Sequence, residues 1–186
     1  KSLHKLLREL CKISGLRWIR ILYCYPEEIT DELIQVIKEE DKICNYLDLP
    51  IQHASDGILK RMGRRTSKKQ LIEIVEKLRK EIPDIAIRTT LITGFPGETQ
   101  EQHEELMEFV DEMEFDRLGV FTYSPEEDTP AAEMPDQIPE EVKEDRQAEL
   151  MELQQEIAFD LAEDMIGREV LVMIEGKVAD ENAYVG

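Results

Sequence analysis

Cysteine is scarce in this sequence, and its placement lacks the spacing of common metal and redox sites. The three cysteines are Cys11, Cys24 and Cys44, and no two of them form a CxxC pair. An odd and sparse set of this kind argues against a disulfide framework and favours a reducing compartment. We therefore interpret these residues as ordinary buried thiols, expect no metal ligands, and expect the protein to be cytoplasmic.

Long hydrophobic runs are also missing. No apolar run approaches the ~20 residues that a membrane helix needs, and the first residues form a charged helical pattern rather than a signal peptide. The apolar fraction of 41% in 186 residues still suffices for a packed core. We expect one domain, or one domain and part of another, with no membrane partner. A first residue other than methionine suggests a piece excised from a longer chain.

Positive charge is in short supply. The net charge of −19 repels phosphate backbones, which argues against a nucleic-acid partner and favours a basic protein partner. The charge is also uneven along the chain. Residues 60–69 carry six basic side chains, whereas residues 133–164 carry twelve acidic side chains against only two basic ones, Lys143 and Arg146.

Strand and helix patterns alternate four times over the first two thirds of the chain. Continuous apolar segments predict the strands, and apolar residues at helical spacing predict the helices. Thr99 and Gln102 have the spacing of a capping box, which marks one helix start. The expected strands are 18–24, 44–51, 84–93 and 117–123, and the expected helices are 2–13, 28–40, 67–81 and 99–113. Such alternation predicts right-handed βαβ units and a parallel sheet.

The last third of the chain has a different pattern. A loop rich in proline and acidic residues is expected at 124–138, followed by a long acidic helix at 139–165. A strand is then expected at 168–176, and a second one near Ala183. These patterns divide the chain into an α/β domain (1–138), a connecting helix (139–165) and the start of a β-domain (166–186).

Alternation along each strand predicts which side chains face the interior of the sheet. The apolar residues are expected to pack beneath the helices, which sends the intervening residues to the other face. On this pattern Arg20, Asp48 and Arg88 share one interior, together with Gln52 and Thr90. A buried charge without a partner is costly, so the three charges pair with each other or with a ligand. Two interpretations stay open: a structural ion cluster, or a polar pocket for a charged small molecule.

Two loops follow strands at the edge where parallel barrels place their active sites. QHASDG (52–57) offers an amide, an imidazole, a hydroxyl and a carboxylate. TGFPGET (93–99) contains Gly94 and Gly97, which allow tight turns and close approach of a ligand. The helix that begins after Glu98 adds backbone donors. We expect the candidate site at these loops.

Histidine and arginine residues leave alternatives open. His53 is interpreted as a pocket-lining or hydrogen-bonding residue, with a catalytic base or metal ligand as the less favoured alternative. His4 and His103 fall on predicted helix surfaces and are expected to be solvated. The basic run 60–69 is a solvated face or, as the alternative, contacts an anion through Arg64 or Arg65. No Ser-His-Asp set, P-loop or HExxH motif is present.

Three segments carry a family resemblance. They read DLPIQHASDGILKRMGR, IRTTLITGFPGET and FTYSPEEDTPAA, in that order. With them, residues 1–165 resemble the methylthiotransferases of the radical S-adenosylmethionine (SAM) superfamily, and residues 166–186 resemble the beginning of a TRAM domain. QHAS at 52–55 is similar to the RimO type, which modifies an aspartate of a small-subunit ribosomal protein. The tRNA-modifying MiaB type usually has QSGS there.

The resemblance implies both a fold and a chemistry. The fold is α/β: part of a TIM-like radical SAM barrel with about four parallel strands and outer helices, then the start of a small all-β TRAM domain. The implied cofactors are SAM and, in the full-length enzyme, two 4Fe–4S clusters. One SAM methylates a sulfur, and another yields a 5′-deoxyadenosyl radical that takes hydrogen from the β-carbon of the target aspartate. The implied partners are a basic ribosomal protein and, through a complete TRAM domain, RNA.

The sequence departs from the family at the cluster. The CxxxCxxC motif that binds the cluster is missing, so we expect no catalytic residue, no cluster and no activity in the chain as given. The cofactor-binding residues that the resemblance implies are Asp48, Gln52, His53, Ser55, Arg64, Arg88, Thr90, Gly94 and Gly97. Two alternatives remain: the tRNA-modifying type, and a non-catalytic protein-binding module. We also expect self-association through the apolar strand 18–24, if no segment covers its edge.

Overall fold

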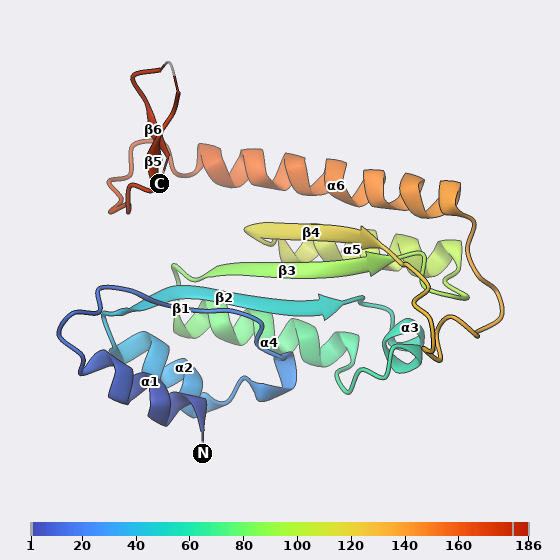
Figure 1. The fold of residues 1–186 in the computed structure, drawn as a ribbon, viewed down its shortest axis with the longest axis horizontal. Coiled ribbons are helices and arrows are strands. Elements are labelled where there is room, and N and C mark those ends of the chain that lie inside the picture. Colours follow the sequence, from blue (N-terminus) through green and yellow to red (C-terminus); the bar gives the residue numbers. More distant parts are fainter. Residues whose placement is uncertain (1, 180, 186) are drawn as a thin grey trace.

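A four-stranded parallel sheet forms the centre of the molecule (Figure 1). The computed structural model describes residues 2–179 and 181–185. The strands are β1 (Ile19–Ile21), β2 (Ile43–Gln52), β3 (Ala86–Thr93) and β4 (Arg117–Thr122). They lie across the sheet in chain order, and each neighbouring pair is parallel. The predicted parallel sheet is therefore confirmed.

Helices cover one face of this sheet and one of its edges. Along the chain they are α1 (Leu3–Cys11), α2 (Asp31–Glu39), α3 (Asp56–Arg61), α4 (Lys68–Glu81), α5 (Gln100–Met113) and α6 (Glu140–Glu163), with a short 3-10 helix at Pro26–Glu28. In Figure 1, α2, α4 and α5 lie on the same side of the sheet, and α6 runs alongside β4. The short helix α3 was not predicted from the sequence, where a loop was expected at 52–57 and no element at 58–61.

Burial along β3 follows the alternation predicted from the sequence. Ile87 and Leu91 are fully buried and belong to the same core as Leu71 and Phe109 of the covering helices. Arg88 and Thr90 are half-buried on the opposite, open face. The period of two in a strand thus separates the apolar core from the face that carries the polar residues.

Two of the covering helices begin with capping boxes. In α5, Thr99 accepts a hydrogen bond from the backbone of Gln102, whose side chain accepts one from the backbone of Thr99, as the spacing predicted. Ser67 and Gln70 form the same arrangement at the start of α4. These caps satisfy backbone donors that a helix start leaves free, and they fix where each loop turns into a helix.

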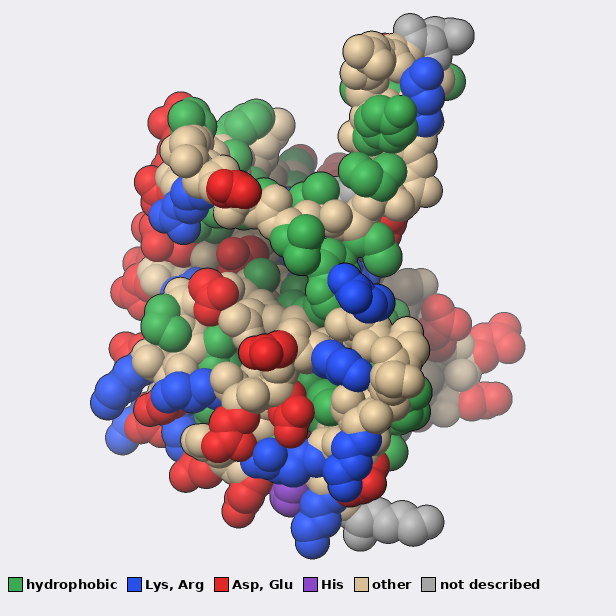
Figure 2. All heavy atoms as spheres, turned by 90° about the vertical axis from the view of Figure 1, so that its left-hand side faces the viewer, with side chains coloured by type: hydrophobic (Ala, Val, Ile, Leu, Met, Phe, Trp, Pro, Cys, Tyr) green, Lys and Arg blue, Asp and Glu red, His purple; other side chains and the backbone are tan. Residues whose placement is uncertain are grey.

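The expected strand at 168–176 is largely wrong. Residues 168–175 have no strand structure, and Val170 to Ile174 are exposed. Only β5 (Gly176–Lys177) pairs, antiparallel, with β6 (Tyr184–Val185), near the strand expected at Ala183. The apolar segment has no partner strand within the part of the chain that the structure describes. Without a partner it cannot form the backbone hydrogen bonds that stabilise a strand. Figure 2 shows hydrophobic side chains gathered at the base of this hairpin, which stands clear of the body.

No helix among the described residues is long and apolar enough to cross a membrane.

Candidate active site

The carboxyl ends of β2, β3 and β4 lie at one edge of the sheet, where the loops that follow them border an open pocket of about 660 Å³. Its lining residues are Gln52, Arg61, Met62, Gly63, Arg64, Ile92, Phe95, Thr122, Tyr123, Ser124, Thr129, Pro130, Ala131 and Met134. Gln52 and Arg64 belong to the residues that the sequence analysis had selected. The apolar wall is formed by Phe95 and Tyr123, whose rings meet edge to face at 5.1 Å between centroids.

Among the polar side chains that line this pocket are Gln52, Arg64 and Tyr123. The hydroxyl of Tyr123 is buried and has no hydrogen-bond partner among the described residues. Arg64 lies over the ring of Tyr25, with its guanidinium carbon 5.4 Å from the centroid. Gln52 ends β2 with a φ of 73°, a conformation that is strained for a residue other than glycine. An apolar wall with an amide and a guanidinium beside it is the kind of lining that small-molecule sites use.

The ion pair predicted on the open face of the sheet is confirmed. Nη1 of Arg88 donates to Oδ2 of Asp48 at 3.0 Å, and Asp48 is 1% exposed. Oδ1 of Asp48 has no partner within the described chain, so it remains an acceptor. Arg20 does not join this pair: its guanidinium carbon lies 4.9 Å from the ring centroid of Tyr46. The three charges therefore form one ion pair and one cation–π contact.

The two glycines of the GFPG loop are required by the chain itself. Both have a φ of +73°, a conformation that side chains with a Cβ rarely adopt. A Cβ on Gly94 would collide with the side chain of Lys143, and one on Gly97 would collide with Arg61. Arg61 also donates to the carbonyl of Pro96 at 2.8 Å. The close approach that the sequence analysis expected from a ligand is thus made by two basic side chains of the protein.

His53 lies beneath the site rather than on its surface. It is fully buried, and its Nδ1 accepts a hydrogen bond from the backbone of Ser55 at 2.9 Å. This leaves the proton of a neutral ring on Nε2, which lies 3.7 Å from Oε1 of Glu98. Ser55 is itself buried at the start of α3. His53 and Ser55 therefore support the loop and do not line the pocket.

The expectation that His103 is solvated is wrong. This residue of α5 is 1% exposed, and its Nε2 lies 2.7 Å from Oε2 of Glu149 on α6. Its Nδ1 lies 3.9 Å from Oε1 of Glu98. The sequence pattern of α5 could not reveal this burial, because the covering element α6 is distant in sequence. His4, by contrast, is half-exposed on α1.

Glu98 is the residue that the sequence analysis passed over. It is 2% exposed, and its carboxylate accepts hydrogen bonds from the backbone of Gly94 and from that of Phe95 at 3.1 Å. Burial alone raises the pKa of this carboxyl, but the nearby His53, Arg146 and backbone donor of Gly94 together hold its pKa below the ordinary value. The ionised form is thus stabilised inside the protein.

The cysteines do not fit an iron–sulfur cluster. Burial raises the pKa of Cys24, and burial and Glu40 raise that of Cys11, which disfavours the thiolate that a cluster needs. No three His, Cys, Asp or Glu side chains in residues 2–179 and 181–185 are placed to hold a metal ion. No step is therefore assigned to a cluster bound by these residues.

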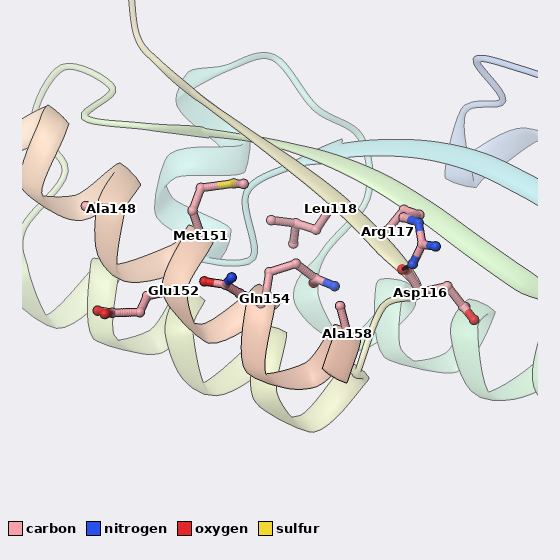
Figure 3. A pocket seen from close by; sticks show the side chains of 9 residues that line it. Asp116, Arg117, Leu118, Ala148, Met151, Glu152, Gln154 and Ala158 are labelled. Carbon is pink, nitrogen blue, oxygen red and sulfur yellow. Dashed lines mark hydrogen bonds between the residues drawn. The ribbon is translucent and has the colours of Figure 1, made fainter. Parts of the chain in front are cut away.

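A second hollow lies at the other end of the sheet (Figure 3). It has a volume of about 630 Å³ between β4 and α6, and Figure 3 shows Leu118 and Met151 pointing into it, with Asp116, Arg117 and Glu152 around its rim. This hollow lies at the amino end of β4, away from the loops described above. No titratable cluster converges on it among the residues drawn, so the pocket at the carboxyl ends remains the candidate site.

Comparisons with known proteins identify the family. A family model described as the radical SAM superfamily matches residues 1–110. The chain is 67% identical over 186 residues to the ribosomal protein uS12 methylthiotransferase RimO of Lachnoclostridium phytofermentans, covering 100% of this chain and 42% of that protein. It is 59% identical over 175 residues to the protein of the same name from Geobacter sulfurreducens, covering 94% of this chain and 39% of that protein.

A solved structure supports the fold. The coproporphyrinogen III oxidase HemN of Escherichia coli, described as a radical SAM enzyme, superimposes with a TM-score of 0.60 at 24% identity, covering 90% of this chain and 38% of that chain. The chain thus spans roughly two fifths of the relatives it matches. Its partial barrel, its family match and its similarity to these relatives lead to one conclusion: the chain belongs to the radical SAM superfamily.

Proposed function

We propose that this chain forms the SAM-binding side of a methylthiotransferase that modifies the β-carbon of an aspartate in a small-subunit ribosomal protein. The observation that carries the proposal is the 67% identity, over the whole chain, to a protein named for methylthiotransfer to uS12. The acidic surface, with a net charge of −19, supports a basic protein as the substrate. SAM, when cleaved reductively at a 4Fe–4S cluster elsewhere in the enzyme, supplies the radical that abstracts hydrogen.

The residues of this chain bind and orient the cofactor. Phe95 and Ile92 offer an apolar surface for the adenine ring, next to the free hydroxyl of Tyr123. Gln52 and Arg64 supply an amide and a positive charge at the rim.

The remaining residues implied by the family act behind or beside the pocket. Asp48, with Arg88 as its partner, keeps a buried acceptor on the open face of β2, and Thr90 lies on the same face of β3. His53, Ser55, Gly94 and Gly97 shape the two loops. In this proposal Asp48, Arg88 and Thr90 contact bound molecules, and the four loop residues hold the loops in place.

The test compares two substrates. The full-length enzyme, with reconstituted clusters, SAM and a reductant, is incubated either with recombinant uS12 or with unmodified tRNA, and the products are analysed by mass spectrometry. We expect a methylthio group on one aspartate of uS12 and none on tRNA. Modification of tRNA alone would establish the tRNA-modifying alternative, which the QHAS segment and the acidic surface disfavour. Modification of neither would leave a non-catalytic binding module as the better explanation.

A further inference from the structure

The only two basic residues of the acidic segment 133–164 point into the protein. Lys143 and Arg146 of α6 are 4% and 7% exposed, although α6 is otherwise strongly acidic. Lys143 donates from Nζ to the carbonyl of Tyr123 at 2.9 Å, and its aliphatic stem fills the space above Gly94. One helix outside the matched residues 1–110 therefore contacts the GFPG loop and Tyr123, which follows β4, at the pocket.

Arg146 reaches the same loop through Glu98. Its Nη1 donates to the carbonyl of Glu98 at 3.2 Å and lies 3.5 Å from Oε1 of that side chain. Glu98 in turn accepts from the backbone donors of Gly94 and Phe95, the residue that forms the pocket wall. A chain of contacts thus runs from α6 through one buried carboxylate to the wall of the candidate site.

Glu98 has no comparable cation other than Arg146 among the described residues. Its other charged or titratable neighbours are the rings of His53 and His103, at 3.7 and 3.9 Å, and both rings are buried. A buried carboxylate that loses its cationic partner is strongly destabilised and tends to take up a proton or draw in water. Either response would weaken the two backbone hydrogen bonds that shape the loop.

We propose that Arg146 is a positioning residue: acting through Glu98, it holds the Gly94–Phe95 backbone in the conformation that binds SAM, so that α6 is part of the cofactor site. The identity of the ligand, SAM, rests on the proposed function. The effect on the loop does not, because it can be measured without any ligand.

A purely structural role for Arg146 would be docking of α6 against the sheet, and α6 provides a matched control for this. Gln154 is 5% exposed and donates from Nε2 to the carbonyl of Phe115 at 2.8 Å. This contact lies at the opposite end of the β4 segment from the loop. Gln154→Leu should loosen the helix to a similar degree and leave the GFPG loop unchanged.

The experiment uses Arg146→Met, Arg146→Lys and Gln154→Leu in the full-length enzyme, with thermal unfolding of each. The first readout is amide hydrogen exchange at Gly94 and Phe95 without ligand. The second is the dissociation constant for SAM from calorimetry. We expect Arg146→Met to speed exchange at both amides and to weaken SAM binding on the order of tenfold. Arg146→Lys should recover part of both effects, and Gln154→Leu should change neither.

A double variant separates positioning from stability. In Arg146→Met with Glu98→Gln no unpaired buried charge remains, so thermal stability should recover towards that of the wild type. The neutral amide cannot restore the charged acceptor, so SAM binding should stay weak. Equal recovery of stability and SAM binding would overturn the proposal, as would unchanged exchange and binding in Arg146→Met. If the wild type itself binds no SAM, the proposed function fails, while the exchange at Gly94 and Phe95 still decides the role of Arg146.

Discussion

The two edges of the sheet end in different ways. At the β4 edge, three side chains of α6 donate to backbone carbonyls: Lys143 to Tyr123, Gln147 to Val120 and Gln154 to Phe115, at 2.9, 2.6 and 2.8 Å. At the β1 edge, the three-residue strand pairs only with β2, and no other strand lies beside it among the described residues. Trp18 and Leu22, on either side of β1, are 42% and 47% exposed.

This difference shows that a helix can complete a sheet edge without adding a strand. Side chains on one face of α6 take the place of the backbone donors that a neighbouring strand would supply, so these carbonyls are satisfied inside the protein. An open edge retains free donors and acceptors and can pair with another strand. The β4 side is therefore the closed end of the partial barrel, and the β1 side is the end at which the sheet can extend.

The largest effect is expected from removing the amide donors at the closed edge. Gln147→Leu combined with Gln154→Leu leaves two carbonyls of the β4 segment without partners, which should lower the free energy of unfolding by about 2–5 kcal/mol. Urea denaturation of the purified chain measures this. Gln155→Leu is the matched control, because that side chain is exposed and should change stability by less than about 0.5 kcal/mol. Equal stability of the double variant and this control would contradict the role given to α6.

Acid offers a second way to loosen the closed edge. The pKa of Glu98 is lower when folded than its ordinary value of 4.5, because His53 and Arg146 outweigh the effect of burial. Its stabilising contribution is therefore fully present above pH 4.5 and is lost as the pH falls through the lower, folded pKa. Unfolding curves are measured between about pH 3 and 6, because this range spans the ordinary titration of a carboxyl group. Stability should fall less steeply with decreasing pH in Glu98→Gln than in the wild type. Parallel curves would show that Glu98 does not contribute.

Self-association tests the open edge. Leu22→Lys places a charge beside β1 and should weaken association of the 186-residue chain on the order of tenfold, as measured by light scattering. Phe121→Lys is the control, because Phe121 is 58% exposed on β4, where α6 covers the edge. A wild-type chain that stays monomeric at high concentration, with slow exchange of the β1 amides, would show that the edge is covered after all.

The smallest effect is expected from the helix starts near each edge. Thr99→Ala removes the cap of α5 and should lower the free energy of unfolding by about 1 kcal/mol. Ser2→Ala, at the start of α1, should change it by less than about 0.5 kcal/mol, because Ser2 makes no capping hydrogen bond. Thermal unfolding of the two variants measures this difference. Similar losses would mean that the two helix starts are equally anchored.

Local patterns were enough to predict the sheet and one of its charged pairs. The alternation in β3 placed Arg88 on the open face, where it meets Asp48. The cap of α5 was visible from Thr99 and Gln102. Each of these features depends on residues that are close in sequence, or on the period of two within a strand.

Features that depend on α6 were not predicted. Glu98 and His103 are buried because Arg146 and Glu149 lie against them, and nothing in the neighbouring sequence indicates this. One signal was available: Lys143 and Arg146 are the two bases in the acidic segment 133–164. The apolar residues 170–174 led to the opposite error, because a strand pattern needs a partner strand to become a strand.

The donors that α6 gives to β4 have a consequence for exchanging parts between relatives. The family match ends at residue 110, before β4 and α6 begin. A chimera joined at that boundary would keep Lys143, Gln147 and Gln154 with their acceptors on Tyr123, Val120 and Phe115. The contacts of Arg146 with Glu98 and of Glu149 with His103 would instead cross the junction and would depend on a foreign partner. Residues 115–163 can therefore be exchanged as one unit, provided that the recipient supplies a matching carboxylate and imidazole.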